Sequence, residues 1–180
     1  MGKRNMDFVK GKKKFEDPES IQKGIGLHRM IDAFTDIHEA TKQAGQFFKP
    51  AVGRYSGAFV DVAYDHFLAN DTNEFSDESL KNFASHTYAS LNAHLENLPE
   101  KFSGMLPYMS TQNWLYNYKT LLGIEKSFNG LARRAAYLNS STEVFEAFQK
   151  NYISLQQCYH SFFPSLKAYA FIKLDELIKQ

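Results

Sequence analysis

Apolar residues recur along most of the chain with the spacing of α-helices. Leu80, Phe83, Thr87 and Leu91 follow one another at intervals of three or four residues, which places them on one stripe of a helix. No stretch alternates apolar and polar residues with the β-branched enrichment of a strand. The pattern therefore predicts an all-α fold, a single helical domain over residues 1–180 with about seven or eight helices.

Polar capping residues predict where several of these helices begin. Asp17-Pro18-Glu19 is typical of a helix start, because Asp caps, Pro fits the first turn and Glu complements the helix dipole. Thr35-Asp36 is expected to cap a second helix. Ser140-Ser141-Thr142-Glu143 matches a capping box, and we expect one long helix to carry the apolar residues from Val144 to Tyr159.

Prolines and glycines predict where helices end. Pro50 and Gly53 are expected to end the second helix, and Pro107 to interrupt a later one. Gly123 is expected to stop one helix before the next begins at Ile124. Pro164 is expected to kink or break the last helix.

Charge and cysteine content limit the compartments and the partners that are expected for the protein. The net charge is only +1, but residues 1–16 form a basic N-terminal segment in which Lys12, Lys13 and Lys14 are consecutive. That segment is either a solvated terminus or a patch that attracts phosphate or an acidic protein. The single cysteine, Cys158, excludes an intrachain disulfide, and no apolar run is long enough for a membrane span. We therefore expect a cytoplasmic protein that binds neither membrane nor nucleic acid.

The segment around His28 is the first place where the sequence offers chemistry. His28 and Asp32 are four residues apart, so they point the same way from a helix. Asp36 joins them only if the helix passes Thr35 unbroken. A lone histidine on such a face is usually a packed, hydrogen-bonded residue.

A second cluster offers the same groups. Asp61 and Asp65 are again four residues apart, and His66 lies about 100° further round the helix. Imidazole nitrogens and carboxylate oxygens from two such helices could hold Mn²⁺, Fe²⁺ or Zn²⁺ between them. Arginines such as Arg29 or Arg54 could neutralise the carboxylates instead, so spacing alone leaves both readings open.

Other residues carry weaker signals. Asp7, taken alone, is more typical of a cap or an ion pair than of a metal ligand. Adjacent Arg133 and Arg134 usually form a solvated face, although near a phosphodiester they could act as a clamp. The chain has no phosphate-binding glycine loop, Cys-x-x-Cys, His-Glu-x-x-His or nucleophile elbow, so P-loop, zinc-finger, zincin and serine-hydrolase functions have no support.

The order of several motifs resembles the acyl-carrier-protein phosphodiesterase family over nearly the whole chain. The motifs are Asp7-Phe8-Val9-Lys10-Gly11, Gly24-Ile25-Gly26-Leu27-His28-Arg29-Met30-Ile31-Asp32-Ala33-Phe34-Thr35-Asp36, Tyr64-Asp65-His66-Phe67-Leu68, Trp114-Leu115 and Gly130-Leu131-Ala132-Arg133-Arg134. The resemblance implies hydrolysis of holo acyl carrier protein, an acidic partner, to apo acyl carrier protein and 4′-phosphopantetheine. It also implies a distorted, all-helical relative of the HD metal phosphohydrolases that uses a divalent metal, with Mn²⁺ as the expected ion.

The same resemblance implies which residues form the site. The implied metal ligands are Asp7, His28, Asp32, Asp65 and His66. The Asp65-His66 doublet reverses the usual His-Asp order, which leaves the ligand within it open.

Further residues are assigned to the chemistry around the metal-activated water. Asp36 or Asp61 is expected to handle protons. The residues expected to balance phosphate charge are Lys10, Arg29, Arg133 and Arg134.

The N-terminus departs from the family pattern. Members usually carry a further segment before the Asp-Phe-Val motif, whereas this chain begins Met1-Gly2-Lys3-Arg4. A first helix and one possible histidine ligand are therefore expected to be missing. Two alternatives follow: a metal-dependent phosphohydrolase of a small phosphoester or nucleotide, and a catalytically inactive module that binds the carrier protein.

Overall fold

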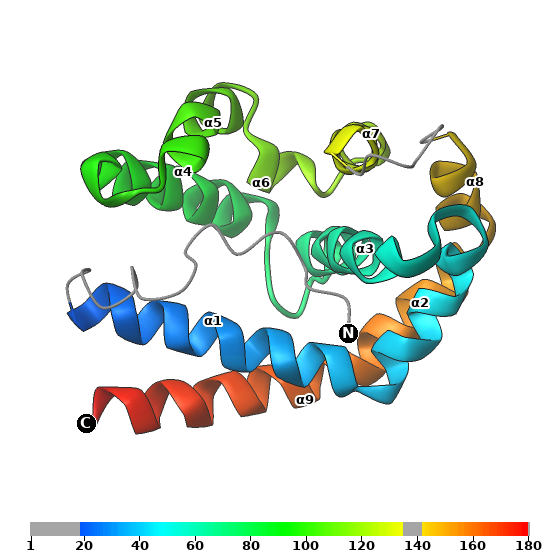
Figure 1. Ribbon diagram of the computed structural model, residues 1–180, viewed down its shortest axis with the longest axis horizontal. Helices are drawn as coiled ribbons and strands as arrows, with labels where there is room; N and C mark the ends of the chain where they lie inside the picture. The colour runs from blue at the N-terminus through cyan, green and yellow to red at the C-terminus, as the bar shows by residue number, and fades with distance from the viewer. Residues whose placement is uncertain (1–18, 135–141, 180) are drawn as a thin grey trace. The chain divides into compact units, whose positions relative to one another are not determined.

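The described part of the chain is all-α, as predicted. The computed structural model describes residues 19–134 and 142–179, and these ranges contain nine α-helices, two 3₁₀ helices and no strand (Figure 1). The helices are α1 (Glu19–Ile37), α2 (Glu39–Val52), η2 (Gly53–Tyr55), α3 (Ser56–Asn70), α4 (Asp77–Ala93), η3 (Leu95–Asn97), α5 (Glu100–Thr111), α6 (Trp114–Asn117), α7 (Leu121–Arg134), α8 (Thr142–Lys150) and α9 (Tyr152–Ile178). No helix of these ranges is long and apolar enough to cross a membrane.

The described residues fall into two compact units. One unit contains residues 61–134 and 142–145, and the other contains residues 19–60 and 146–179, so the division falls within α3 and α8. The single domain expected from the sequence stays a prediction.

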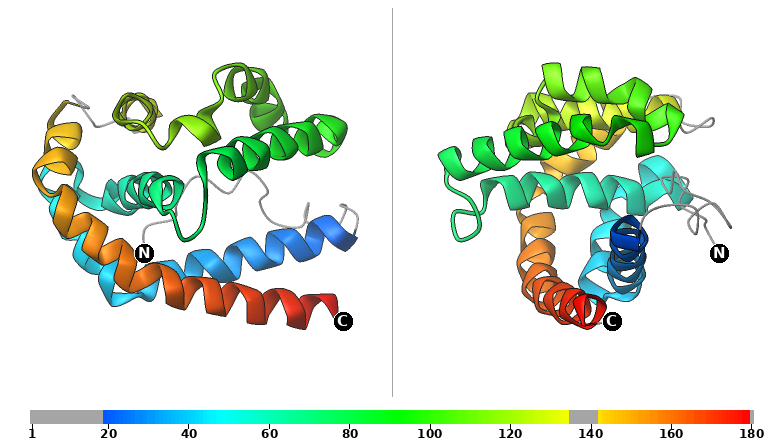
Figure 2. Two further views of the ribbon diagram at one scale, coloured as in Figure 1. Left: turned by 180° about the vertical axis from the view of Figure 1, so that it is seen from behind. Right: turned by 90° about the vertical axis from the view of Figure 1, so that its left-hand side faces the viewer.

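In the unit that carries α1, α2 and α9, aromatic side chains join the helices. α1 and α9 lie side by side, and α2 packs against α9 (Figure 2). The Phe34 ring of α1 stacks on Tyr169 of α9 with centroids 4.5 Å apart. His38, whose Nδ1 accepts from the Ala40 amide at 3.3 Å, also places its ring edge-on to Phe162 at 5.2 Å. His38 therefore both caps α2 and packs where α1 ends.

In the other unit, a small core holds α4, α5 and α6 together. Ala84 and Tyr88 of α4 and Leu106 of α5 are buried. Partly buried apolar residues surround them, namely Leu91, Leu98, Met109, Leu115 and Tyr116. The Tyr88 hydroxyl accepts a hydrogen bond of 3.0 Å from the Leu115 amide, so the polar end of this side chain is satisfied inside the core.

Helix starts differ from the predictions at two places. Thr35-Asp36 does not cap α2, because α1 continues to Ile37 and the Thr35 hydroxyl donates to the Ile31 carbonyl at 2.8 Å. The prediction of one long helix from Val144 to Tyr159 is wrong as well. This stretch forms two helices that are divided at Asn151, whose side-chain amide donates to the Ala147 carbonyl at 2.8 Å and so competes with the backbone. Asp17, Pro18, Ser140 and Ser141 lie outside the described residues.

Prolines end fewer helices than expected, whereas one glycine does end a helix. Pro107 lies inside α5, Pro164 lies inside α9, and Pro50 lies in the last turns of α2. A proline inside a helix costs about 3 kcal/mol, which burial of neighbouring apolar side chains can offset. α9 bends along its length but is not broken (Figure 1). Gly53 does end α2, with a positive φ of 54° that favours glycine.

Gly123 is not a helix stop but a residue inside α7 at a close backbone approach. α7 begins at Leu121, and the preceding α6 contains only four residues. A Cβ atom at Gly123 would lie 2.7 Å from the carbonyl carbon of Asn117, too close for any real side chain. The absence of a side chain therefore allows the turn before α7 to fold back on the helix.

We predict that Gly123→Ala destabilises the protein by about 1–3 kcal/mol, because the new methyl group must push the Asn117 backbone away. The matched control is Gly104→Ala in α5, where nothing lies within 4 Å of the added Cβ. That substitution should stabilise by about 0.5–1 kcal/mol through helix propensity. Urea unfolding followed by circular dichroism measures both changes, and equal behaviour of the two variants would contradict the prediction.

Candidate functional site

α1 presents the first pair of predicted site residues. His28 Nε2 lies 3.5 Å from Asp32 Oδ2, and the two side chains are 61% and 44% exposed. The predicted sharing of one helix face is therefore confirmed, and both groups are open to a ligand. Because α1 passes Thr35 unbroken, Asp36 lies one further turn along the same face.

α3 presents the second pair. Asp61 and Asp65 are separated by one helical turn, and Asp65 reaches solvent. The protein around Asp65 nevertheless displaces much of the water that would solvate its charge. This desolvation, together with repulsion from the Asp61 carboxylate, raises the pKa of Asp65 from its ordinary 3.8 to about 7. Within the described residues, Asp65 forms no hydrogen bond or ion pair that would offset this cost.

His66 occupies a different environment from Asp65. It is only 3% exposed, and its Nδ1 lies 2.7 Å from the Tyr118 carbonyl oxygen. Because a carbonyl can only accept, Nδ1 carries the hydrogen, and the neutral ring then has its lone pair on Nε2. Burial lowers the pKa of His66, and the bond to Tyr118 opposes that shift. A backbone carbonyl on one ring nitrogen is also how many metal-binding histidines are oriented.

Asn70 completes the attachment of α3 to the turn after α6. Its side-chain amide donates to the His66 carbonyl at 2.8 Å and to the Lys119 carbonyl at 3.0 Å. Together with the bond from His66 to Tyr118, these contacts fix the rotation of α3 about its axis. Asp65 therefore reaches solvent while its neighbour His66 is held in the interior.

The remaining predicted residues lie in different parts of the chain. Arg29 is half-buried on α1, Arg133 is exposed at the end of α7, and Arg134 is the last residue of that helix. Asp7 and Lys10 lie outside the described residues. His28, Arg29, Asp32 and Asp36 belong to one unit, whereas Asp61, Asp65, His66, Arg133 and Arg134 belong to the other.

The structure thus forms the two carboxylate-bearing pairs, each within its own unit. Across residues 19–134 and 142–179, no group of three or more His, Cys, Asp or Glu side chains is arranged to hold a metal ion. The ligand set of a metal and the roles implied for these residues stay predictions. Two closely spaced carboxylates are nevertheless the donor chemistry that a hard divalent cation prefers.

One polar cluster was not predicted from the sequence. The Asp77 carboxylate accepts from Tyr116 at 2.8 Å and pairs with Lys81 at 2.8 Å and with Lys119. Hydrogen bonds from Lys119, Lys81 and Tyr116 hold the pKa of Asp77 well below its usual range. The spacing of Asp77 and Lys81 by four residues was a visible signal, whereas the approach of Lys119 and Tyr116 depends on tertiary structure. This cluster joins the start of α4 to the same turn that holds α3.

Comparison with known proteins identifies similar chains. The sequence model of a family described as "Acyl carrier protein phosphodiesterase" matches residues 1–166. A protein of that name from Yersinia pestis is 30% identical over 167 residues, which cover 92% of this chain and 86% of the relative. Another of the same name, from Photorhabdus laumondii subsp. laumondii, is 29% identical over 165 residues, which cover 91% of this chain and 83% of the relative. No solved structure matches the chain.

We predict that Asp65→Asn stabilises the metal-free protein increasingly as the pH rises from about 4 to 7, with a plateau above 7. The raised folded-state pKa means that folding favours the protonated carboxyl, so this stabilisation is lost as the pH rises through about 7. Asparagine has no proton to lose and avoids that loss. The measurement is the free energy of unfolding by urea at several pH values with a chelator present.

The variant Asp61→Asn should recover part of the same gain, because it removes the like charge but not the desolvation. If the difference in the free energy of unfolding between Asp65→Asn and the wild type does not change with pH, the Asp65 pKa is not raised.

Proposed function

Because the chain belongs to the acyl carrier protein phosphodiesterase family, we propose that it hydrolyses holo acyl carrier protein to apo acyl carrier protein and 4′-phosphopantetheine. The observation that carries the proposal is the family match over residues 1–166, which includes every residue of the candidate site. In the reaction, a water oxygen bonds to phosphorus and the bond from phosphorus to the serine oxygen breaks. The serine oxygen takes up a proton, and the phosphate stays on pantetheine.

We propose a divalent metal, Mn²⁺ by preference, as the cofactor. Asp65 and Asp61 fit it, because a bound cation would offset the desolvation and the repulsion from Asp61 that together raise the pKa of Asp65. Asp7, His28, Asp32 and His66 stay the predicted further ligands. When bound, the ion would supply activation of water and neutralisation of phosphate charge.

The carboxylates and the imidazole have separable roles in this proposal. The Asp32 carboxylate, 3.5 Å from His28 Nε2, orients the imidazole ring. Asp36 or Asp61 takes the proton released from water and returns one to the serine oxygen. These side chains therefore hold groups in place and move protons.

Cationic side chains would balance the charge of the phosphodiester. Lys10, Arg29, Arg133 and Arg134 are the candidates, and guanidinium groups bind phosphate oxygens in pairs. The partner is proposed to be an acidic protein, which the basic N-terminal segment would attract at low salt. The proposed compartment is the cytoplasm, where the buried Cys158 stays a free thiol.

We predict that Asp65→Asn lowers hydrolysis of holo acyl carrier protein at least about 100-fold in the presence of Mn²⁺, because it removes a charged metal ligand. The measurement is the mass lost by the carrier protein when its prosthetic arm is released. The matched control, Asp71→Asn, lies just beyond α3 in the same unit and should retain activity. Full activity of Asp65→Asn would contradict the role given to this residue.

Two further outcomes would contradict the proposed reaction itself. Hydrolysis of free nucleotides but not of holo acyl carrier protein would indicate a small-phosphoester hydrolase. Binding of the carrier protein without release of the arm at any Mn²⁺ concentration would indicate an inactive binding module. Circular dichroism of each variant separates loss of activity from loss of fold.

A further inference from the structure

The C-terminal half of α9 exposes an apolar stripe. Phe171, Leu174 and Ile178 are 62%, 39% and 69% exposed, and they follow Lys167 at intervals of three or four residues. These four residues, which we call the α9 stripe, fall within about 60° of one another around the helix axis. A surface helix normally places polar residues at such positions, so this face is typical of a helix that pairs with another helix.

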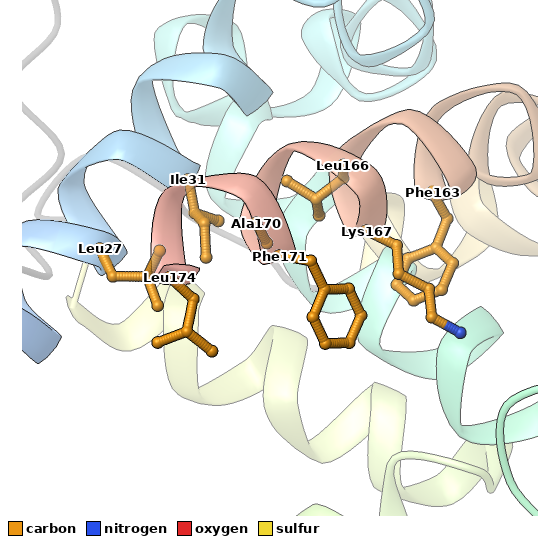
Figure 3. Close-up of a pocket in the computed structure, with 8 residues that line it drawn as sticks. All are labelled: Leu27, Ile31, Phe163, Leu166, Lys167, Ala170, Phe171 and Leu174. Carbon is orange, nitrogen blue, oxygen red and sulfur yellow. The ribbon is translucent and has the colours of Figure 1, made fainter. Parts of the chain in front are cut away.

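A groove runs beside the α9 stripe. It has a volume of about 260 Å³ and lies between α1 and α9 (Figure 3). Apart from Lys167 its lining is apolar, with Leu27 and Ile31 from α1 and Phe163, Leu166 and Ala170 among the contributions from α9. Ala170 leaves space at the floor, and the Phe171 ring projects from the rim. The stripe and the groove therefore form one ridge and one hollow on the same unit.

The apolar area of this surface corresponds to a small interface between two chains. The three apolar stripe residues, at their exposed fractions, present roughly 300 Å². Phe171 and Leu174 also line the groove, so its walls add little to this total, which stays below the roughly 500 Å² of apolar surface that one partner contributes to a standard interface. An apolar area below the standard size is typical of weak, transient pairs of chains.

The order of charges along α9 indicates the partner. Phe171 lies midway between Lys167 and Asp175, four residues from each, and Asp175, which pairs with Lys179 of its own helix end, flanks the stripe. In an antiparallel pair of identical helices that cross at Phe171, Lys167 of each chain lies opposite Asp175 of the other. A parallel pair would instead oppose like charges. The surface is therefore complementary to itself under a two-fold axis.

We propose that the α9 stripe is a homodimer interface, in which α9 of a second copy packs antiparallel and its Phe171 enters the groove beside α1. The family match ends at residue 166, before all the residues of the α9 stripe, whereas the groove walls formed by Leu27, Ile31, Phe163 and Leu166 lie within it. It is independent of the proposed reaction, because none of its residues belongs to the candidate site.

The first test is sedimentation velocity of the full chain from about 1 to 100 μM, a range that reports micromolar dissociation constants. The wild type should approach twice the 20.7 kDa mass of one chain. Phe171→Glu should raise the dissociation constant at least about 10-fold. Ile172→Glu is the matched control, because Ile172 is 58% exposed but lies about 100° from Phe171, and it should leave the dimer intact.

The second test exchanges two charges and reports whether the two helices are parallel or antiparallel. Lys167→Asp and Asp175→Lys should each weaken the dimer, and the double variant should restore it, since opposite charges then face each other again. A wild type that stays monomeric throughout the range would overturn the proposal. Equal weakening by Ile172→Glu, failure of the double variant to recover, or binding of the monomer to phospholipid vesicles through the stripe would overturn it too. Circular dichroism confirms that every variant is folded.

Discussion

The desolvation of Asp65 beside a second carboxylate, Asp61, is the constraint on which the candidate site depends. Desolvation makes ionisation of Asp65 costly, and the Asp61 carboxylate one helical turn away on α3 adds to that cost. The metal-free protein therefore holds a carboxyl group whose pKa is near neutrality. A divalent cation would turn this unfavourable pair into a favourable one, so the same two residues oppose stability without a ligand and would provide affinity with one.

The turn between α6 and α7 holds α3 in the rotation that exposes Asp65 and buries His66. Tyr118 and Lys119 accept hydrogen bonds from His66 and Asn70, and Gly123 lets the backbone before α7 approach closely. The turn also carries Lys119, which pairs with Asp77 at the start of α4. A short irregular segment thus fixes two helices. Its contacts explain why His66 is buried although its neighbour in the sequence, Asp65, reaches solvent.

Residue spacing was sufficient to predict the local features of the fold and the site. The shared face of His28 and Asp32 is confirmed, because it depends only on helical geometry over four residues. The expected interruption at Pro107 did not occur, because packing of nearby side chains outweighs the lost backbone hydrogen bond there. Local preferences are small beside the burial of a large apolar side chain.

The sequence by itself determined the all-α class, the two carboxylate-bearing pairs and, through the order of its motifs, the family. Each of these three features follows from helical periodicity or from residue identity, and none of them requires knowledge of contacts between distant residues. Only the tertiary structure decided that His66 is buried against Tyr118 while Asp65 reaches water, and that Lys119 and Tyr116 join Asp77. Those outcomes depend on partners about 40 to 50 residues away, whose approach is set by the packing of whole helices and not by any local pattern.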